Sequence, residues 1–103
     1  MTVLNRMQQI WKSAPEMMHA LPEAPLKTAR RFYYDTLVYE APLLRALASM
    51  FGTGRLMIGT DDPFPIRQQK PGDFLLSSGF AGTELDAMLG ANALRFLGIN
   101  SPA

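Results

Sequence analysis

A short apolar run, RLMIGT at residues 55–60, constrains the fold of this chain more than any other feature. Leu56, Met57 and Ile58 follow one another with no polar residue between them. A strand with one solvated face alternates apolar and polar residues, whereas a continuous apolar strand is covered on both faces, as in a parallel sheet. The run therefore predicts a buried strand of a parallel α/β fold.

A second strand and a helix precede this run. The segment RRFYYDTLVY at residues 30–39 is rich in aromatic and β-branched residues, which favour strands. The segment APLLRALASMFGTG at 41–54 places its large apolar residues on one face of a helix, with Pro42 in the first turn and Gly52 or Gly54 as the stop. Strand, helix and strand within about 30 residues predict a βαβ unit.

Two parallel strands do not form an independent sheet, because parallel sheets are buried on both faces by helices. The length of 103 residues suits one domain and not two. We therefore predict that residues 1–103 form a single partial domain of a larger α/β fold. Helices are also predicted near residues 3–12 and 73–78, and a closing helix from Thr83 as N-cap to Gly98, in which Gly90 would permit close packing.

Composition and charge exclude several classes of protein. The chain is 48% apolar and 18% charged, and ten basic against nine acidic residues leave a net charge of +1. Such a balance gives no footprint for nucleic acid or an anionic membrane. The absence of cysteine excludes disulfides, thiolate metal sites and cysteine nucleophiles. No apolar run approaches the ~20 residues of a membrane-spanning helix, and no signal-peptide pattern is present, so a cytoplasmic location is expected.

Candidate functional residues follow the two predicted strands. In parallel α/β folds, ligands bind at the carboxyl ends of the strands. This rule selects Asp35 and Thr36 at the end of the first strand, and Thr60, Asp61 and Asp62 at the end of the second. A carboxylate directly after a buried strand can bind a metal, act as a general base or cap the next turn. The residues alone leave these alternatives open for Asp35 and Asp61, whereas Asp62 is expected to be a solvated turn residue.

Other reactive side chains are sparse. His19 is the single histidine, and the sequence has no His-x-His, no His-Glu-x-x-His and no cysteine pair. The serines lack the G-x-S-x-G context of a serine hydrolase, and the glycine pairs in GTGR and GFAGT are not a phosphate-binding loop. The residues alone therefore do not establish catalysis.

Three motifs, taken in their order and spacing, resemble a known family. RRFYYDTLVY, GRLMIGTDDPFPI and GANALRFLGI resemble the C-terminal portion of the amidohydrolase-related family, and within it the branch of aminocarboxymuconate-semialdehyde decarboxylase. The likeness covers about residues 20–99. It implies a C-terminal fragment of a metal-dependent (β/α)₈ TIM barrel, made of the last two strands and the terminal helices. It also implies hydrolysis or nonoxidative decarboxylation of a small carboxylic acid, with a divalent metal, Zn²⁺ above all, as cofactor.

The resemblance assigns roles to individual positions. Asp61 matches the aspartate that ends the eighth strand of the family, is associated with the metal and helps to handle the proton of the bound water. Asp61 is therefore the candidate catalytic and metal residue. Asp35 and Thr36 match the end of the seventh strand and, together with Thr60, make up the possible pocket.

Three further positions complete the match. Asn92 corresponds to an asparagine of the terminal helix, for which a structural role is expected. Asp62 stands where relatives commonly have tyrosine, and Tyr39 stands where many have histidine, so the resemblance leaves the roles of these two residues open.

The histidine ligands of the family have no counterpart in this sequence. One aspartate does not hold a catalytic zinc, which typically takes three protein ligands plus water, so we predict that the chain alone binds no cofactor and is inactive. Unpaired strand edges predict self-association or pairing with a chain that supplies the missing barrel portion. Two alternatives remain: a subunit of a split enzyme that donates Asp61 to a shared site, and a noncatalytic oligomerisation or interaction module.

Overall fold

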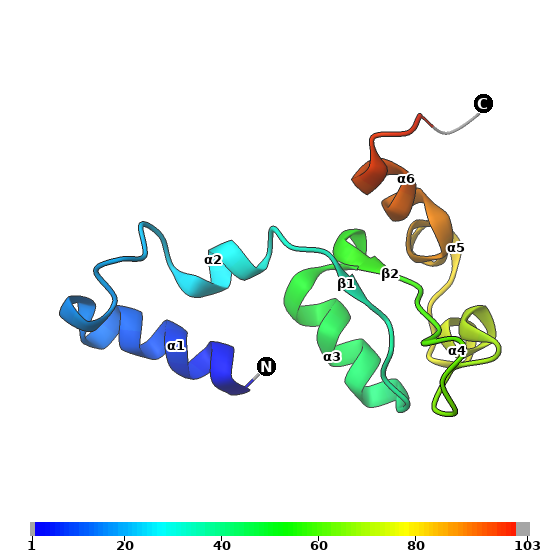
Figure 1. Ribbon diagram of the computed structural model, residues 1–103, viewed down its shortest axis with the longest axis horizontal. Helices are drawn as coiled ribbons and strands as arrows, with labels where there is room; N and C mark the ends of the chain where they lie inside the picture. Colours follow the sequence, from blue (N-terminus) through cyan, green and yellow to red (C-terminus); the bar gives the residue numbers. More distant parts are fainter. Residues whose placement is uncertain (1, 101–103) are drawn as a thin grey trace. The chain divides into compact units, whose positions relative to one another are not determined.

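The computed structural model describes residues 2–100 of the chain. The chain divides into two compact units, Met1–Phe32 and Tyr33–Ala103, and Figure 1 labels the elements of each. Within residues 2–100, no helix is both long and apolar enough to cross a bilayer.

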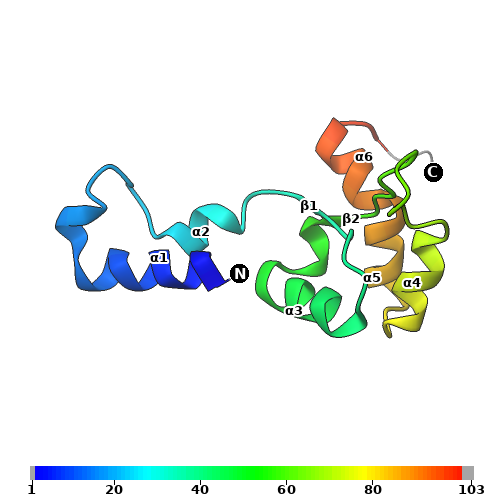
Figure 2. The same cartoon turned by 60° about the horizontal axis from the view of Figure 1, so that its bottom comes forward.

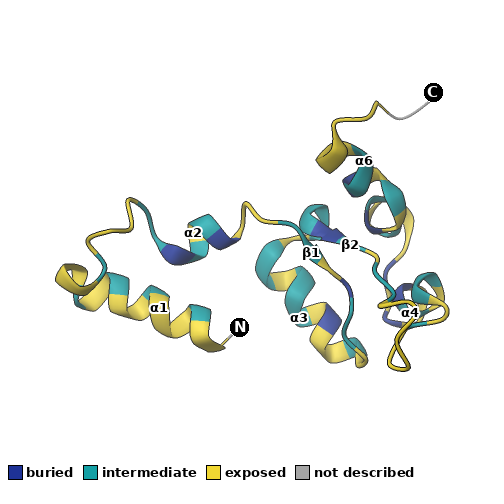
Figure 3. Ribbon diagram, viewed as in Figure 1, coloured by how far each residue is buried: buried dark blue, intermediate teal, exposed yellow. Residues whose placement is uncertain are grey.

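The first unit is helical. It contains α1 (Thr2–Ser13), a 3₁₀ turn (Pro15–Met17) and α2 (Pro25–Ala29). The helix predicted near residues 3–12 is confirmed as α1, in which no residue is buried (Figure 3). The side-chain oxygen Oε1 of Gln8 accepts a hydrogen bond from the Leu26 N–H at 2.9 Å, which ties α1 to α2.

The second unit holds the strands and the remaining helices, and Figure 2 shows them from a second direction. Its elements in chain order are β1 (Tyr34–Asp35), α3 (Ala41–Phe51), a 3₁₀ turn (Thr53–Arg55), β2 (Leu56–Met57), α4 (Pro71–Ser77), α5 (Gly82–Asp86), a π-helical turn (Ala87–Ala91) and α6 (Asn92–Leu97).

The two strands pair in parallel, which confirms the predicted βαβ unit. Tyr34 lies opposite Leu56 and Asp35 opposite Met57, and α3 connects the strands along the chain. The strands are much shorter than the segments that predicted them. Within residues 2–100 the sheet has two strands only, so neither strand has an outer neighbour to extend its ladder.

The hydrophobic core of the second unit forms around β2. Leu56 is fully buried, whereas Ile58 is 37% exposed, so the predicted cover on both faces holds for the beginning of the apolar run and not for its end. Helix α3 before β2, and α4, the segment after it and the π-helical turn after β2, contribute to the same cluster. Its buried members are Leu44, Leu56, Leu75, Phe80 and Met88.

The closing segment differs from the predicted single helix. It begins at Gly82 with Ala81 in the N-cap position, so the prediction of Thr83 as N-cap is wrong. The interpretation of Gly90 is also wrong, because a Cβ added there would meet no atom within 4 Å. Gly98 ends α6 as predicted, with a left-handed φ of 70° that glycine adopts without strain.

A π-helical turn explains the break in this segment. The N–H of Asn92 bonds to the carbonyl of Ala87, five residues back, so the helix widens at this point. The Met88 carbonyl within the turn accepts a hydrogen bond from the Ile58 N–H at 3.1 Å. The widened turn thereby binds the helix to the residue that follows β2.

Candidate functional site

The carboxyl ends of β1 and β2 lie at the same edge because the strands are parallel. The Thr36 N–H donates to the Met57 carbonyl at 2.9 Å, which carries the pairing one step beyond β1. A Cβ on Gly59 would lie 3.2 Å from Cδ1 of Leu37 and 3.3 Å from Cβ of Asp35. Glycine at position 59 therefore permits the close approach of the chain after β2 to Asp35 and Leu37.

Asp35 and Thr36 differ sharply in their surroundings. Asp35 is exposed, and its Oδ1 accepts a hydrogen bond from the Leu37 N–H at 3.0 Å, so the capping alternative is the one observed. Thr36 is fully buried, and its Oγ1 has no hydrogen-bond partner in the part of the chain that the structure describes. Buried polar groups rarely stay unpaired in native proteins.

Asp61 is exposed and has a φ of 58°, in the left-handed region that aspartate tolerates better than most residues. Its backbone carbonyl accepts a hydrogen bond from the Phe64 N–H at 2.8 Å, which closes the next turn. Across residues 2–100, no hydrogen bond or ion pair engages the Asp61 carboxylate. The turn is thus held by the backbone, and the carboxylate stands available at the strand end.

The loop that carries Asp61 is anchored at several points. The Gln68 N–H donates to the Thr60 carbonyl at 2.9 Å, and the Gln68 Nε2 donates to the Val38 carbonyl at 2.7 Å. The Tyr39 hydroxyl donates to the Ile66 carbonyl at 2.9 Å. These bonds hold residues 60–68 against the segment that follows β1. Sequence reasoning missed Gln68, because nothing in the sequence separates it from an ordinary polar loop residue.

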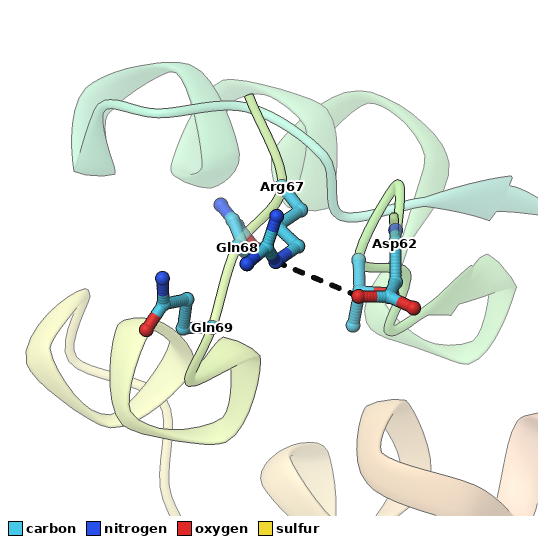
Figure 4. A pocket seen from close by; sticks show the side chains of 5 residues that line it. Asp62, Arg67, Gln68 and Gln69 are labelled. Atoms are coloured by element: carbon cyan, nitrogen blue, oxygen red, sulfur yellow. Dashed lines mark hydrogen bonds and ion pairs between the residues drawn. The ribbon is translucent and has the colours of Figure 1, made fainter. Parts of the chain in front are cut away.

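A cavity of about 450 Å³ opens beside this loop, lined by Thr60, Asp62, Arg67, Gln68 and Gln69 (Figure 4). Asp62 is a solvent-exposed turn residue, as predicted, and its Oδ1 lies 3.5 Å from the Nε of Arg67. The Asp62 N–H donates to the Thr60 Oγ1 at 3.2 Å. The lining therefore combines one cation, one anion and neutral hydrogen-bonding groups.

The described residues do not complete a metal site. Among residues 2–100, no group of three or more His, Asp or Glu side chains is close enough to hold a metal ion. His19 belongs to the first unit, where its Nδ1 lies 3.0 Å from the Glu16 carbonyl oxygen. At the strand ends, Asp61 is the carboxylate left without a partner.

The opposite, amino-terminal edge of the strands is fastened by α6. Asn92 is fully buried, and its Nδ2 donates to the carbonyls of Thr53 at 2.7 Å and Leu56 at 2.8 Å. The Nη2 of Arg95 donates to the Oδ1 of Asn92 at 2.8 Å and to the Gly54 carbonyl at 2.9 Å. The structural role expected for Asn92 is confirmed.

Comparison with known proteins places these features in a family. A model of the amidohydrolases matches residues 2–99. The chain belongs to the amidohydrolase family. The chain is 30% identical over 99 residues to a 2-amino-3-carboxymuconate-6-semialdehyde decarboxylase of Dictyostelium discoideum. This match covers 94% of the chain and 28% of the Dictyostelium protein.

A solved amidohydrolase structure from Mycobacterium avium subsp. paratuberculosis K-10 matches with a TM-score of 0.71 at 21% identity. That match covers 99% of the chain and 26% of the mycobacterial protein. The chain therefore has the fold of a part of an amidohydrolase and spans little more than a quarter of the relatives it matches. The family resemblance inferred from the three motifs is confirmed. Amidohydrolases are generally metal-dependent, and these matches specify no particular metal.

Proposed function

We propose that this chain is the C-terminal portion of a metal-dependent amidohydrolase-like enzyme, with β1 and β2 as the last two strands of a (β/α)₈ barrel. The proposed reaction is hydrolysis or nonoxidative decarboxylation of a small carboxylic acid. The observation that carries the proposal is the parallel pairing, which brings Thr36, Thr60 and Asp61 to one edge of a chain matched by the family over residues 2–99. The named decarboxylase relative supports decarboxylation as the first reaction to test.

Asp61 carries the chemistry in this proposal. Its side chain is exposed, follows the apolar run of β2 after Gly59 and Thr60, and engages no other described residue. Such a group can accept and return a proton, provided that its partner lies within hydrogen-bond reach. A divalent metal such as Zn²⁺ is the implied cofactor, but residues 2–100 supply one carboxylate and not the typical set of three protein ligands. We therefore assign Asp61 proton transfer and expect no turnover by the chain alone.

A second candidate follows from the apolar surface of the second unit. Phe64, Ile66, Phe96 and Leu97 are each 59–65% exposed. Large exposed apolar side chains, two on the loop after β2 and two on α6, favour contact with another protein. This observation favours a chain that pairs with the missing barrel portion, as a subunit of a split enzyme. Self-association as a noncatalytic oligomerisation module would cover the same side chains without using Asp61.

A chimera tests the proposal. Residues 2–99 of this chain replace the matching segment of the Dictyostelium decarboxylase, and the product is assayed with 2-amino-3-carboxymuconate 6-semialdehyde. We expect the chimera to decarboxylate this compound. Asp61→Asn removes the proton acceptor at nearly constant size, so kcat should fall by about a hundredfold or more.

The matched control is Asp86→Asn, an exposed aspartate at the end of α5, which should leave kcat unchanged. An active chimera that tolerates Asp61→Asn would exclude the proposed role of Asp61 and favour the noncatalytic module. Turnover by the isolated chain with added Zn²⁺ would contradict the expectation that it needs the rest of the barrel.

A further inference from the structure

The cavity beside the Asp61 loop is lined by one cation, the guanidinium of Arg67. The Nη1 of Arg67 donates to the carbonyls of Pro63 and Phe64, at 3.3 Å each, and its Nε lies 3.5 Å from the Oδ1 of Asp62. These contacts hold the guanidinium against its own turn. Among described residues, no hydrogen bond engages its remaining nitrogen, Nη2, and the Arg67 side chain is 38% exposed.

The backbone beneath Arg67 is fixed as well. The Arg67 N–H donates to the Phe64 carbonyl at 3.0 Å, and the next residue, Gln68, is bound through its main chain to Thr60 and through its side chain to Val38. A donor fixed before the ligand arrives loses little conformational entropy on binding. Arg67 is therefore preorganised on the loop that carries Asp61.

The cavity lining indicates the chemistry of the ligand. Besides Arg67, the amide of Gln69 and the hydroxyl of Thr60 are hydrogen-bond donors in the lining. Figure 4 shows the Asp62 and Arg67 side chains directed toward each other, with their ion pair dashed. Asp62 is 71% exposed in this pair, and exposed ion pairs are weak, so an incoming anion can compete for the guanidinium.

We propose that Arg67 binds the carboxylate of a small carboxylic acid substrate in this cavity, and that Asp62 weakens this binding by holding the guanidinium. The inference rests on the proposed function for the identity of the ligand, while the binding itself can be measured without turnover. The planar guanidinium suits a carboxylate because it offers two parallel N–H donors. Arg67 is thus a residue that determines substrate specificity.

Binding is tested on the full chain with maleate as the probe and the neutral maleamide as its control. Maleate should shift the NMR signals of the Arg67 side chain and of the amides of residues 60–69. Arg67→Gln should weaken maleate binding about tenfold, as expected for a lost charge-assisted hydrogen bond. Arg67→Lys keeps the charge without the planar donor pair and should give an intermediate loss. Asp62→Asn removes the competing carboxylate and should strengthen binding.

The same substitutions in the chimera connect binding to catalysis. Arg67→Gln should raise KM about tenfold and change kcat little, because it removes an interaction made equally by bound substrate and transition state. An inactive chimera with Arg67-dependent maleate binding would overturn the proposed function and leave this subsite standing. An active chimera in which Arg67→Gln alters neither maleate binding nor KM would overturn the subsite alone. Equal binding of maleamide would exclude a carboxylate as the recognised group.

Discussion

The two edges of the β1–β2 pair differ in whether their polar groups have hydrogen-bond partners. At the amino edge, Asn92 and Arg95 donate hydrogen bonds to three backbone carbonyls, those of Thr53 and Gly54 before β2 and that of Leu56, the first residue of β2. At the carboxyl edge, the Thr36 hydroxyl and the Asp61 carboxylate have no partner among the described residues, and Asp61 has a left-handed φ. The polar groups named at the amino edge are thus hydrogen-bonded, whereas those named at the carboxyl edge are left without a described partner.

The difference separates stability from function. A fully paired polar cluster fixes the position of β2 and leaves nothing for a ligand to bind. A buried polar group without a hydrogen-bond partner lowers the stability of the fold, and so does a residue in a sparsely populated backbone conformation. Such destabilising features are common at functional sites. Parallel barrels follow the same division, with residues at the carboxyl ends of strands serving catalysis and those at the opposite face serving stability.

The largest expected effect comes from Asn92→Asp. Aspartate keeps the size of the side chain and can still accept from Arg95, but it cannot donate to the carbonyls of Thr53 and Leu56. The buried Leu56 carbonyl and the part-buried Thr53 carbonyl lose their donor and a charge is buried, so the free energy of unfolding should fall by about 3 kcal/mol. Urea unfolding followed by circular dichroism measures the change.

Asn100→Asp is the matched control, because Asn100 is exposed near the end of the second unit. Its effect should stay within about 0.5 kcal/mol. If both substitutions lowered the free energy of unfolding by similar amounts, the added negative charge would explain the result at Asn92, and not the loss of its hydrogen bonds at the amino edge.

Local sequence signals predicted helices and strands of this molecule, but they did not predict the tertiary hydrogen bonds that hold its segments together. Pro42 and Gly52 delimit α3 through their own backbone preferences, and Leu56 is buried as a continuous apolar run predicts. The parallel rule selected Asp61, which the structure places in the loop four residues after the end of β2, and its functional role stays a prediction. Gln68, by contrast, acts through Val38, thirty residues earlier in the chain, and no local preference encodes such a contact. Tertiary hydrogen bonds of this kind become visible only in the structure.

Thr36→Val should produce a smaller effect of opposite sign at the carboxyl edge. Valine has nearly the shape of threonine and removes a buried hydroxyl that has no described partner. The free energy of unfolding should therefore rise by about 1 kcal/mol. If the unpaired Thr36 hydroxyl serves function at the expense of stability, the same substitution in the chimera should lower kcat/KM.

Ser78→Ala provides the contrast within the same unit. Its hydroxyl is also buried, but it donates to the Phe74 carbonyl at 2.7 Å. Loss of that bond should lower the free energy of unfolding by about 1 kcal/mol. If Thr36→Val destabilised the chain as Ser78→Ala does, the Thr36 hydroxyl would be satisfied and the carboxyl edge would no longer differ from the amino edge.

The smallest expected effect is a pH dependence at the amino edge, where the pKa values of Tyr33 and Tyr34 are shifted in opposite directions. A hydrogen bond from Arg95, reinforced by the positive charges of Arg95 and Arg55, lowers the pKa of Tyr33 below its ordinary 10.0. Burial raises the pKa of Tyr34 above the same value. Ultraviolet titration of tyrosinate should therefore show one group ionising early and one late, and Tyr33→Phe should remove the early one.

The stability of the amino edge should follow the ionisation of Tyr33. Because its pKa is lower in the folded chain than in the unfolded chain, the ionised form stabilises the fold above the unfolded value near 10.0, and this contribution is lost as the pH falls through the folded pKa. The contribution is absent at neutral pH, where the hydroxyl is protonated in both states. Between the two pKa values, the stability of the chain relative to Tyr33→Phe should thus increase with pH, and added salt should reduce the increase by screening the arginines. A difference that does not change across this range would mean that Arg95 holds the Gly54 carbonyl without acting on the ionisation of Tyr33.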